Sequence, residues 1–229
     1  VAERIGEEYI IPTLGVWNHF DEIDFNALPD QFVLKCTHDS GGLVICTDKS
    51  KFDREVARKK IEHSLKRNFY WFGREWPYKN VPARIIAEKY MSEDKNDTES
   101  TFNEVNGGLR DYKLYCFDGK VKLYLVTTDR SKGATTGDYF DEKNRHLDLI
   151  WGFPNAKTIP DVPNNIEKMK ELAEILAAGI PQLRVDFYCI HDKVYFGELT
   201  FFDGSGFDEI EQECYRDLLG DYIKLPTLV

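Results

Sequence analysis

Residues 183–202 read LRVDFYCIHDKVYFGELTFF. Two runs typical of β-strands flank the polar segment 191–193, which predicts a hairpin. With a three-residue loop, Asp186 lies directly opposite Glu198. Like charges opposite each other destabilise a sheet, so this register predicts a cation between the two carboxylates, or a neutralising proton. Oxygen ligands of this kind suit magnesium.

The same register sets Arg184 opposite Thr200, on the face that carries the two acids. The residues that alternate with them are apolar and predict a core face: Leu183, Val185, Phe187, Leu199 and Phe201. A two-residue loop is the alternative. It turns Glu198 to the opposite face and leaves both acids solvated.

A second candidate site is the run FVLKC at residues 32–36, which ends in a glycine turn. Lys35 lies within the apolar run, and the turn contains Ser40, Gly41 and Gly42. Glycine lets backbone N–H groups approach phosphate oxygens closely, and lysine supplies a point charge. The spacing matches neither the Walker motif nor the dinucleotide fingerprint. An ordinary hairpin loop is the alternative interpretation.

Two further segments carry candidate ligands. Residues 82–91, PARIIAEKYM, read as a buried strand whose exposed end can hydrogen-bond an adenine edge. Residues 111–126 predict a hairpin with a two-residue Asp-Gly turn. Its expected apolar face is Tyr112, Leu114, Cys116, Val121, Leu123 and Leu125. Lys113 lies on the other face and Arg130 in the following loop, where a solvated edge is the alternative for both cations.

Two helices are also predicted. One covers residues 50–67 and begins at a capping pattern formed by Ser50 and Asp53. It places Phe52, Val56, Ile61 and Leu65 near one face. The other covers residues 164–178, after a proline and before a glycine, with apolar residues at helical spacing.

In chain order, these segments resemble the ATP-grasp superfamily, and within it the TupA-like group, which takes its name from teichuronopeptide biosynthesis. The motifs are the lysine strand with its glycine loop, the EKYM hinge, the DYK strand, and RVD with ELT twelve residues later. The resemblance covers about residues 5–220. It implies an α+β ATP-grasp fold, with two lobes of antiparallel sheet plus helices and ATP between them. Residues 1–82 are expected to form the N-terminal lobe and residues 83–229 the C-terminal lobe.

The resemblance also implies a role for each matched residue. ATP would be bound by Lys35, Ser40, Gly41, Gly42, Glu88, Lys89 and Met91. The Mg²⁺ ligands would be Asp186, Glu198 and Thr200, and the catalytic residues Arg184, Lys113 and Arg130. Two positions depart from the usual pattern: Thr200 stands where many relatives have asparagine, and Lys113 where some have arginine or glutamate.

Members of the superfamily generally join a carboxylate to an amine or thiol through an acyl phosphate. The resemblance therefore implies an ATP-dependent carboxylate–amine ligase, whose carboxylate substrate is a uronic acid or related acid of a cell-surface polysaccharide such as a capsule. Two alternatives stay open. One is an ATP-dependent kinase of a sugar or small molecule, and the other is a nucleotide-binding module without chemistry.

Composition agrees with a cytoplasmic enzyme without selecting one. The 229 residues include five cysteines with no CxxC pair, as expected for reduced thiols. A net charge of −10 disfavours sequence-independent nucleic-acid binding. No apolar run approaches the ~20 residues of a membrane span, and no signal peptide is visible. The chain does not begin with methionine, so we expect further residues before Val1.

Overall fold

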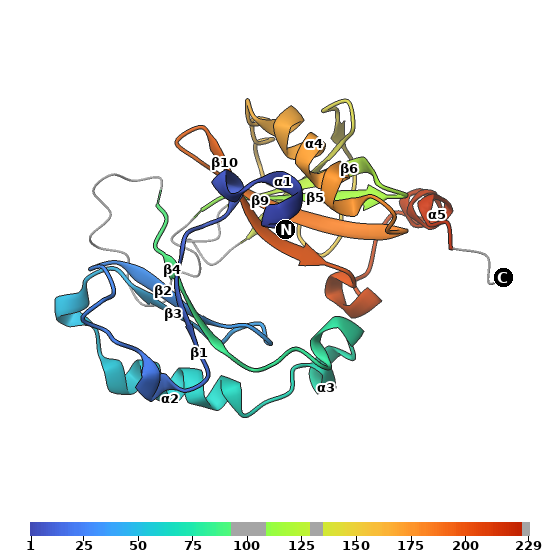
Figure 1. The fold of residues 1–229 in the computed structure, drawn as a ribbon. Coiled ribbons are helices and arrows are strands. Elements are labelled where there is room, and N and C mark those ends of the chain that lie inside the picture. The colour runs from blue at the N-terminus through green and yellow to red at the C-terminus, as the bar shows by residue number, and fades with distance from the viewer. Residues whose placement is uncertain (93–108, 129–134, 226–229) are drawn as a thin grey trace. The chain divides into compact units, whose positions relative to one another are not determined.

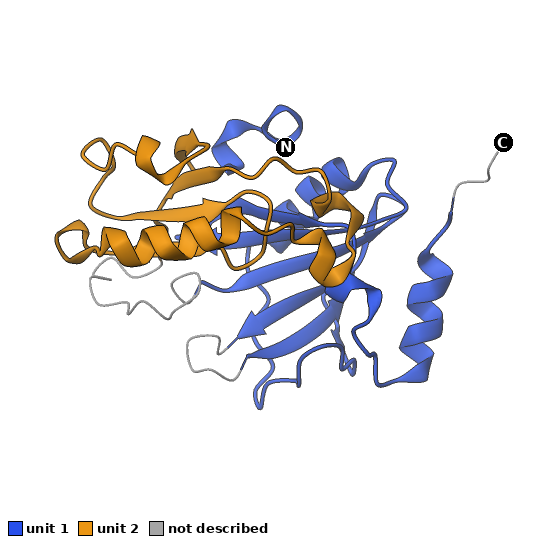
Figure 2. Ribbon diagram, turned by 90° about the horizontal axis from the view of Figure 1, so that it is seen from below, with its two compact units in different colours: residues 1–10, 108–229 blue, residues 11–107 orange. Residues whose placement is uncertain are grey.

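The computed structural model describes residues 1–92, 109–128 and 135–225, and the chain forms two compact units. Unit 2 comprises residues 11–107, and unit 1 combines residues 1–10 with 108–229 (Figure 2). This division differs from the expected boundary after residue 82. The expected hinge strand, Ile85–Lys89, hydrogen-bonds to two strands of the unit 2 sheet and therefore belongs to that unit.

Unit 2 is built on a four-stranded antiparallel sheet in the order β1-β4-β2-β3 (Figure 1). Its strands are β1 (Thr13–Trp17), β2 (Phe32–Cys36), β3 (Leu43–Cys46) and β4 (Ile85–Lys89). Its helices are α2 (Arg54–Leu65) and α3 (Tyr70–Gly73), with short 3₁₀ turns at Phe20–Glu22, Lys49–Lys51 and Trp76–Tyr78.

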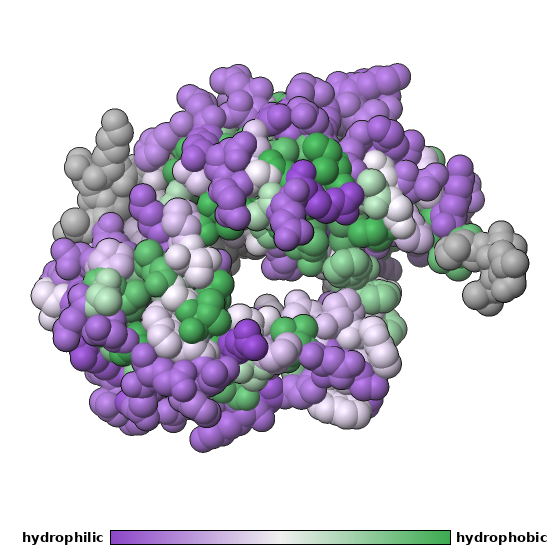
Figure 3. Space-filling view, viewed as in Figure 1, coloured by the Kyte–Doolittle hydropathy of each residue, from purple (hydrophilic) through white to green (hydrophobic). Residues whose placement is uncertain are grey.

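One face of this sheet packs on α2. Phe32 and Leu34 of β2 are fully buried there with Ile61 of the helix, whereas Val33 and Lys35 alternate onto the other face and stay half-buried. Strand alternation thus separates a closed core face from a partly open face. In Figure 3, hydrophobic surface shows over the sheet and hydrophilic surface over the outer side of α2.

Helix α2 begins later than the capping pattern predicts. Asp53 is the N-cap, and its Oδ1 accepts hydrogen bonds from the backbone N–H groups of Glu55 (2.9 Å) and Val56 (3.0 Å). Ser50 lies in the separate 3₁₀ turn before it. The expected placement of Val56 on the core face is wrong, because its side chain is 49% exposed and Ala57 takes the buried position.

Unit 1 holds a six-stranded antiparallel sheet in the order β10-β9-β5-β6-β7-β8. Its strands are β5 (Asp111–Phe117), β6 (Lys120–Thr128), β7 (Thr136–Asp141), β8 (His146–Leu147), β9 (Gln182–Ile190) and β10 (Lys193–Thr200). Its helices are α1 (Ala2–Ile5), α4 (Ile166–Ala177) and α5 (Glu213–Tyr222), with 3₁₀ turns at Glu7–Tyr9 and Asp203–Gly206. Among the described residues, no helix is both long enough and apolar enough to span a bilayer.

The β5–β6 hairpin has the predicted turn but not the predicted faces. Asp118 and Gly119 both have positive φ, 51° and 72°, as a two-residue hairpin turn requires. A register shift then leaves Lys122 without a partner across the pair, because Cys116 faces Val121 and Tyr115 faces Leu123. From Leu123 onward, each side chain of β6 therefore lies on the face opposite to the predicted one.

The bulge corrects the expected apolar face of the hairpin. Leu123 and Leu125 lie with Tyr115, and Tyr124 instead joins the core that contains Leu114. That core is covered by α4, whose residues Met169 and Ala173 are fully buried. The opposite face of the sheet carries the Tyr115 cluster and, among it, the polar side chains of the candidate site.

Candidate functional site

The β9–β10 hairpin closes with a two-residue turn rather than the predicted three-residue loop. His191 and Asp192 both have positive φ, 49° and 60°, and Ile190 pairs with Lys193. A regular hairpin with this turn would have put Glu198 on the face opposite Asp186.

A β-bulge at Gly197 restores the predicted pairing. Phe196 faces Phe187, but the next paired position sets Glu198 opposite Asp186. A Cβ on Gly197 would approach the backbone oxygen of Asp186 to 3.2 Å, so the bulge favours glycine here. Thr200 then pairs with Arg184. The predicted juxtaposition is therefore correct, although the predicted loop length is wrong.

The cation between the two acids comes from the same strand. The Arg184 guanidinium binds Asp186 from Nε to Oδ1 at 2.7 Å and from Nη2 to Oδ2 at 2.9 Å. Its Nη2 also lies 3.7 Å from Oε1 of Glu198. Lys113 Nζ donates to Asp186 Oδ2 at 2.5 Å across the β5–β9 pair. Asp186 is 4% exposed, so it is a buried carboxylate whose negative charge is balanced by Arg184 and Lys113.

Two more acids extend this cluster. Arg184 Nη1 donates to Asp203 Oδ1, and the Tyr115 hydroxyl donates to Asp203 Oδ2 at 2.6 Å. Asp111 lies at the other end, with its Oδ2 3.6 Å from Lys113 Nζ. Burial raises the pKa of Tyr115 well above its usual value. Burial alone would lower the pKa of Arg184, but the neighbouring Asp186 and Asp203 carboxylates raise it.

The donor types of this cluster fit a magnesium ion. Four carboxylates, of Asp111, Asp186, Glu198 and Asp203, meet two cations, and the remaining negative charge matches one divalent ion. Asp186 Oδ2 already accepts two hydrogen bonds, from Lys113 and Arg184, whereas Oδ1 accepts one, from Arg184 Nε, and keeps a lone pair for a metal ion. Glu198 is more available: its side chain is 56% exposed. Within the described residues, no three His, Cys, Asp or Glu side chains form a ready metal cluster.

Unit 2 carries the second group of predicted residues. Lys35 Nζ lies 2.6 Å from Glu88 Oε2, on the half-buried face of the sheet. The side chains are 36% and 19% exposed. Lys89 at the end of β4 is exposed, and Met91 beyond it is half-buried. Lys35 and Glu88 are thus brought together, and each partly neutralises the other.

The glycine turn between β2 and β3 is fixed at its start. Thr37 donates from Oγ1 to the backbone oxygen of Pro82 at 2.9 Å. The buried His38 ring lies with Nε2 3.1 Å from the oxygen of Ser64 and 3.0 Å from that of Arg67, at the end of α2. Because both partners are carbonyl oxygens, Nε2 carries the proton. The start of the loop is therefore anchored on both sides.

The tip of the same turn is open. Ser40 and Gly41 are exposed, and a Cβ on Gly41, whose φ is 113°, would meet no atom within 4 Å. Gly42 is buried, and a Cβ there would lie 2.6 Å from Asp39 Oδ1 and 2.8 Å from Cys36 Sγ. Beyond the anchored start of the turn, Ser40 and Gly41 are thus its exposed residues.

The predicted catalytic residue Arg130 lies outside the described residues. Three residues of the cluster were not predicted as site residues: Asp111, Tyr115 and Asp203. Asp111, Lys113 and Tyr115 occupy every second position of β5, so the sequence already predicts that their side chains share one face of the sheet. Asp203 follows β10 in a 3₁₀ turn, and only the folded turn brings it to Arg184.

Comparison with solved structures places the fold in the ATP-grasp class. The chain is similar to D-alanine–D-alanine ligase from Helicobacter pylori, with a TM-score of 0.51 and 15% identity over 96% of this chain and 54% of that one. It is also similar to the Bacillus anthracis D-alanine–D-alanine ligase (TM-score 0.43, 15% identity, 84% and 51% covered). An L-amino acid ligase from Bacillus licheniformis gives a TM-score of 0.48, 14% identity, and 87% and 41% covered. The chain spans about half the length of the two D-alanine–D-alanine ligases.

A family model narrows this class. The model of the TupA-like ATP-grasp family matches residues 1–224, so the chain belongs to that family. No curated protein matches the chain. The resemblance and the α+β ATP-grasp fold expected from the motifs are both confirmed.

Proposed function

We propose that this protein is an ATP-dependent carboxylate–amine ligase that works through an acyl phosphate. The observation that carries the proposal is the β9–β10 arrangement in a TupA-like ATP-grasp chain. It sets Arg184 and Asp186 opposite Thr200 and Glu198 on one face of the sheet. A fixed guanidinium surrounded by carboxylates suits a reaction that moves a phosphoryl group.

In unit 2, Lys35 is proposed to bind the ATP phosphates. Its ammonium pairs with Glu88 in the structure, and a phosphate oxygen is a stronger partner for it than one partly exposed carboxylate. The exposed backbone of residues 40–41 can donate N–H groups to the same phosphates. Glu88, Lys89 and Met91, at the end of β4, are proposed to contact the adenine.

In unit 1, the carboxylate cluster is proposed to hold Mg²⁺ through Asp186 and Glu198, with the Thr200 hydroxyl holding a metal-bound water. Thr200 Oγ1 already donates to Glu198 Oε1 at 2.7 Å, which fixes the orientation of that carboxylate. A magnesium ion held there would supply charge neutralisation for the ATP phosphates. Lys113 and Arg184 add positive charge on the same face and would stabilise the oxygens of the moving phosphoryl group.

The reaction is proposed to run in two steps. A carboxylate oxygen attacks the γ-phosphorus, the bond to the β-phosphate oxygen breaks, and ADP leaves with the electron pair. The amine nitrogen then attacks the acyl carbon, the carbon–oxygen bond to phosphate breaks, and phosphate leaves. The entering ammonium loses one proton before attack and a second as the amide forms. One of these protons goes to phosphate and the other to solvent or a nearby carboxylate.

The substrates are a finer proposal. The carboxylate is proposed to be a uronic acid or related acid in cell-surface polysaccharide biosynthesis, which agrees with the family's name. Two structural neighbours are described as ligases of D-alanine and of L-amino acids, which agrees with an amine as the second substrate. A cytoplasmic location is proposed with them, because ATP is the co-substrate and the five cysteines are free thiols.

The test follows the products. The protein is incubated with ATP, Mg²⁺, a uronic acid such as glucuronate and a panel of primary amines, with hydroxylamine as a trap in parallel reactions. A ligase forms a hydroxamate with hydroxylamine, and with an amine it forms ADP, free phosphate and an amide. A phosphorylated sugar without free phosphate identifies a kinase, and nucleotide binding without turnover identifies a binding module. Either of these two results would overturn the proposal.

A further inference from the structure

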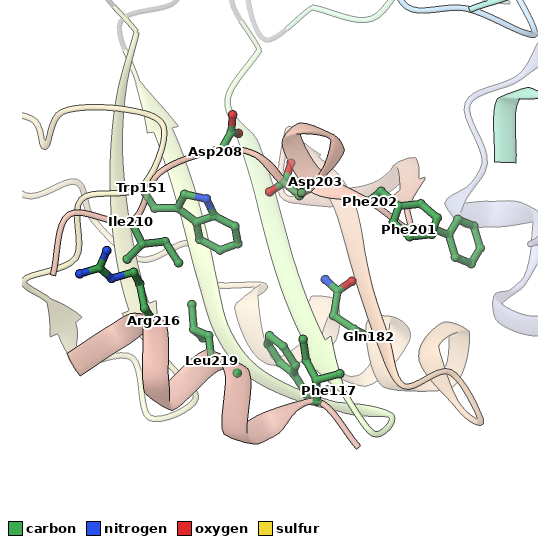
Figure 4. Close-up of a pocket in the computed structure, with 13 residues that line it drawn as sticks. Phe117, Trp151, Gln182, Phe201, Phe202, Asp203, Asp208, Ile210, Arg216 and Leu219 are labelled. Carbon is green, nitrogen blue, oxygen red and sulfur yellow. The ribbon is translucent and has the colours of Figure 1, made fainter. Parts of the chain in front are cut away.

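A pocket of about 310 Å³ lies in unit 1, between α5 and the face of the sheet that carries the Tyr115 cluster (Figure 4). Its walls are mostly aromatic or aliphatic, from Phe117, Trp151, Phe201, Phe202, Ile210 and Leu219. Two carboxylates, of Asp203 and Asp208, lie together at one end, and Arg216 lies beside Ile210. The pocket therefore combines an apolar interior with acids at one end.

Asp203 connects this pocket to the proposed reaction site. Its carboxylate lines the pocket and accepts hydrogen bonds from Arg184 and from Tyr115. Arg184 in turn holds Asp186. A molecule in the pocket therefore lies one side chain away from the guanidinium that we assign to the phosphoryl group. The pocket is therefore adjacent to the proposed reaction site, where the attacking nitrogen has to come within about 3–3.5 Å of the acyl carbon.

Asp208 is the second acid and differs from Asp203 in its partners. Its side chain forms no hydrogen bond and no ion pair with the described residues, and the residue is exposed. A Cβ on Gly204 would lie 2.2 Å from the Asp208 carboxylate carbon, and Gly204 has a φ of 54°. Glycine thus lets the Asp208 carboxylate rest against the turn that carries Asp203. The pocket end has one committed acid and one that is free for a ligand.

This arrangement selects a cation with an apolar body. An ammonium group can donate charge-assisted hydrogen bonds to the Asp208 and Asp203 carboxylates, and an aromatic ring such as Trp151 adds favourable cation–π attraction. An apolar body gains contact with Phe117 and Leu219, which are 4% and 8% exposed. A carboxylate placed at the same end would be repelled by both acids.

We propose that this pocket binds the amine substrate of the ligase, and that this substrate is a primary amine carried on an apolar body, with its ammonium at Asp208 and Asp203. The proposal rests on the ligase function proposed above. It assigns the attacking nitrogen to the pocket, on the side of Arg184 that Asp203 occupies. It also makes Asp208 a specificity residue for the charge of the second substrate.

Direct binding tests the pocket without any turnover. Calorimetric titration of the full chain uses three compounds. Phenethylamine carries an ammonium group and an aromatic ring, ethylamine carries the ammonium group without the ring, and 3-phenylpropanoate carries the ring with a carboxylate. We expect phenethylamine to bind at least about tenfold more tightly than the other two, a difference of about 1.4 kcal/mol. Tighter binding of 3-phenylpropanoate, or equal binding of all three, would overturn the proposal.

Two variants make this test specific. Asp208→Asn should weaken phenethylamine binding about tenfold, because it removes the free carboxylate while leaving the shape unchanged. Arg216→Gln is the matched control: it changes charge in the same pocket, away from the acids, and should not weaken phenethylamine binding. An unchanged affinity in Asp208→Asn, or equal losses in both variants, would place the amine elsewhere.

Turnover separates this proposal from the ligase proposal. In the amide-forming assay, Asp208→Asn should raise the KM for phenethylamine about tenfold, and Arg216→Gln should not. An unchanged KM in Asp208→Asn would overturn the pocket assignment while the ligase function stands. If the unmodified protein forms no hydroxamate with any acid tested, the ligase function fails, and the binding titrations still decide whether the pocket takes amines.

Discussion

Arg184 holds Asp186 with two parallel hydrogen bonds, Nε to Oδ1 at 2.7 Å and Nη2 to Oδ2 at 2.9 Å. The two residues lie two positions apart on β9, and the same guanidinium reaches Asp203. This geometry requires a planar fork of N–H donors, and a lysine ammonium does not have one. Arg184 is therefore the centre of the buried charge cluster.

Removing this centre should destabilise unit 1. Arg184→Gln leaves Asp186, which is 4% exposed, with Lys113 as its single cationic partner, and leaves Asp203 with Tyr115. We expect a loss of about 3–5 kcal/mol in the free energy of unfolding, as for one partner removed from a buried pair. Urea denaturation at pH 7 measures it. Lys168→Gln, which breaks a pair with Glu171 in which both side chains are exposed, should cost much less, and equal losses would argue against a buried cluster.

The position of the acids could be predicted from the sequence, but the path of the strands could not. Spacing and alternation gave the Asp186–Glu198 pair, yet a two-residue turn and a bulge at Gly197 produce it in place of a three-residue loop. An isolated glycine within a strand is a recognised sign of a bulge, so this one was readable. The bulge at Lys122 carries no such sign, and packing on both faces of the sheet decides it.

The partners of the acids were the least predictable part. Facing carboxylates indicated a cation between them, and the structure supplies Arg184, from the strand of Asp186 itself. Local spacing does not show that an arginine two residues away curls back along its own strand. Asp203 was missed for a related reason: a turn with Gly204 in a left-handed conformation carries it back to β9.

Lys35 gives a test of phosphate binding. Lys35→Ala should weaken ATP binding by roughly 1.5–3 kcal/mol, about 10- to 150-fold in Kd, while adenosine binding changes little, because adenosine has no phosphate to contact. Calorimetric titration with both ligands measures the difference. Lys59→Ala, an exposed lysine of α2, is the control for net charge. Equal losses for ATP and adenosine would remove Lys35 from the phosphate role.

Two glycines, one in the β2–β3 turn and one in α5, give substitutions with opposite expected effects on stability. Gly42→Ala should destabilise the protein by about 1–3 kcal/mol, because the new Cβ would press on Asp39 and Cys36 at 2.6 and 2.8 Å. Gly220→Ala lies within α5, where a Cβ meets no atom within 4 Å, and should stabilise by about 0.5–1 kcal/mol. Thermal unfolding of both variants measures these changes in stability. A neutral Gly42→Ala would show that the turn adapts.

Buried thiols predict alkaline instability. Burial raises the pKa of Cys36 and of Cys116 from 9.0 to about 12, and that of Cys46 to about 11. The unfolded chain therefore loses these protons first, so the contribution of these thiols is constant well below pH 9 and falls as the pH rises toward 11–12. Each thiol contributes up to about 1.4 kcal/mol per pH unit in that window.

The slope of stability against pH is the measurement for this prediction. Urea denaturation from pH 7 to 11 should show a shallower decline in Cys116→Ala than in the unmodified protein. Cys214→Ala, which changes an exposed thiol, should leave the slope unchanged. If both variants follow the unmodified protein, other groups, such as the buried tyrosines, dominate the alkaline titration.

The two proposed metal ligands should behave differently in stability and alike in activity. Asp186→Asn removes the charge that Arg184 and Lys113 neutralise. The buried Arg184 and the half-buried Lys113 then lose their shared partner, and the free energy of unfolding should fall by a few kcal/mol. Glu198→Gln changes a side chain that is 56% exposed and 3.7 Å from Arg184, so stability should be nearly unchanged. Urea denaturation without magnesium measures both.

Activity then separates a metal role from a structural one. Both variants should lose magnesium-dependent hydroxamate formation by several orders of magnitude, because phosphoryl transfer depends on charge neutralisation by the metal. Glu198→Gln is the decisive variant, since its folded state should be intact. Thr200→Val, which removes the hydroxyl that donates to Glu198, should cause a smaller loss and a weaker apparent affinity for magnesium. If Glu198→Gln keeps full activity at every magnesium concentration, then the carboxylates of this hairpin serve to hold Arg184 and not a metal ion.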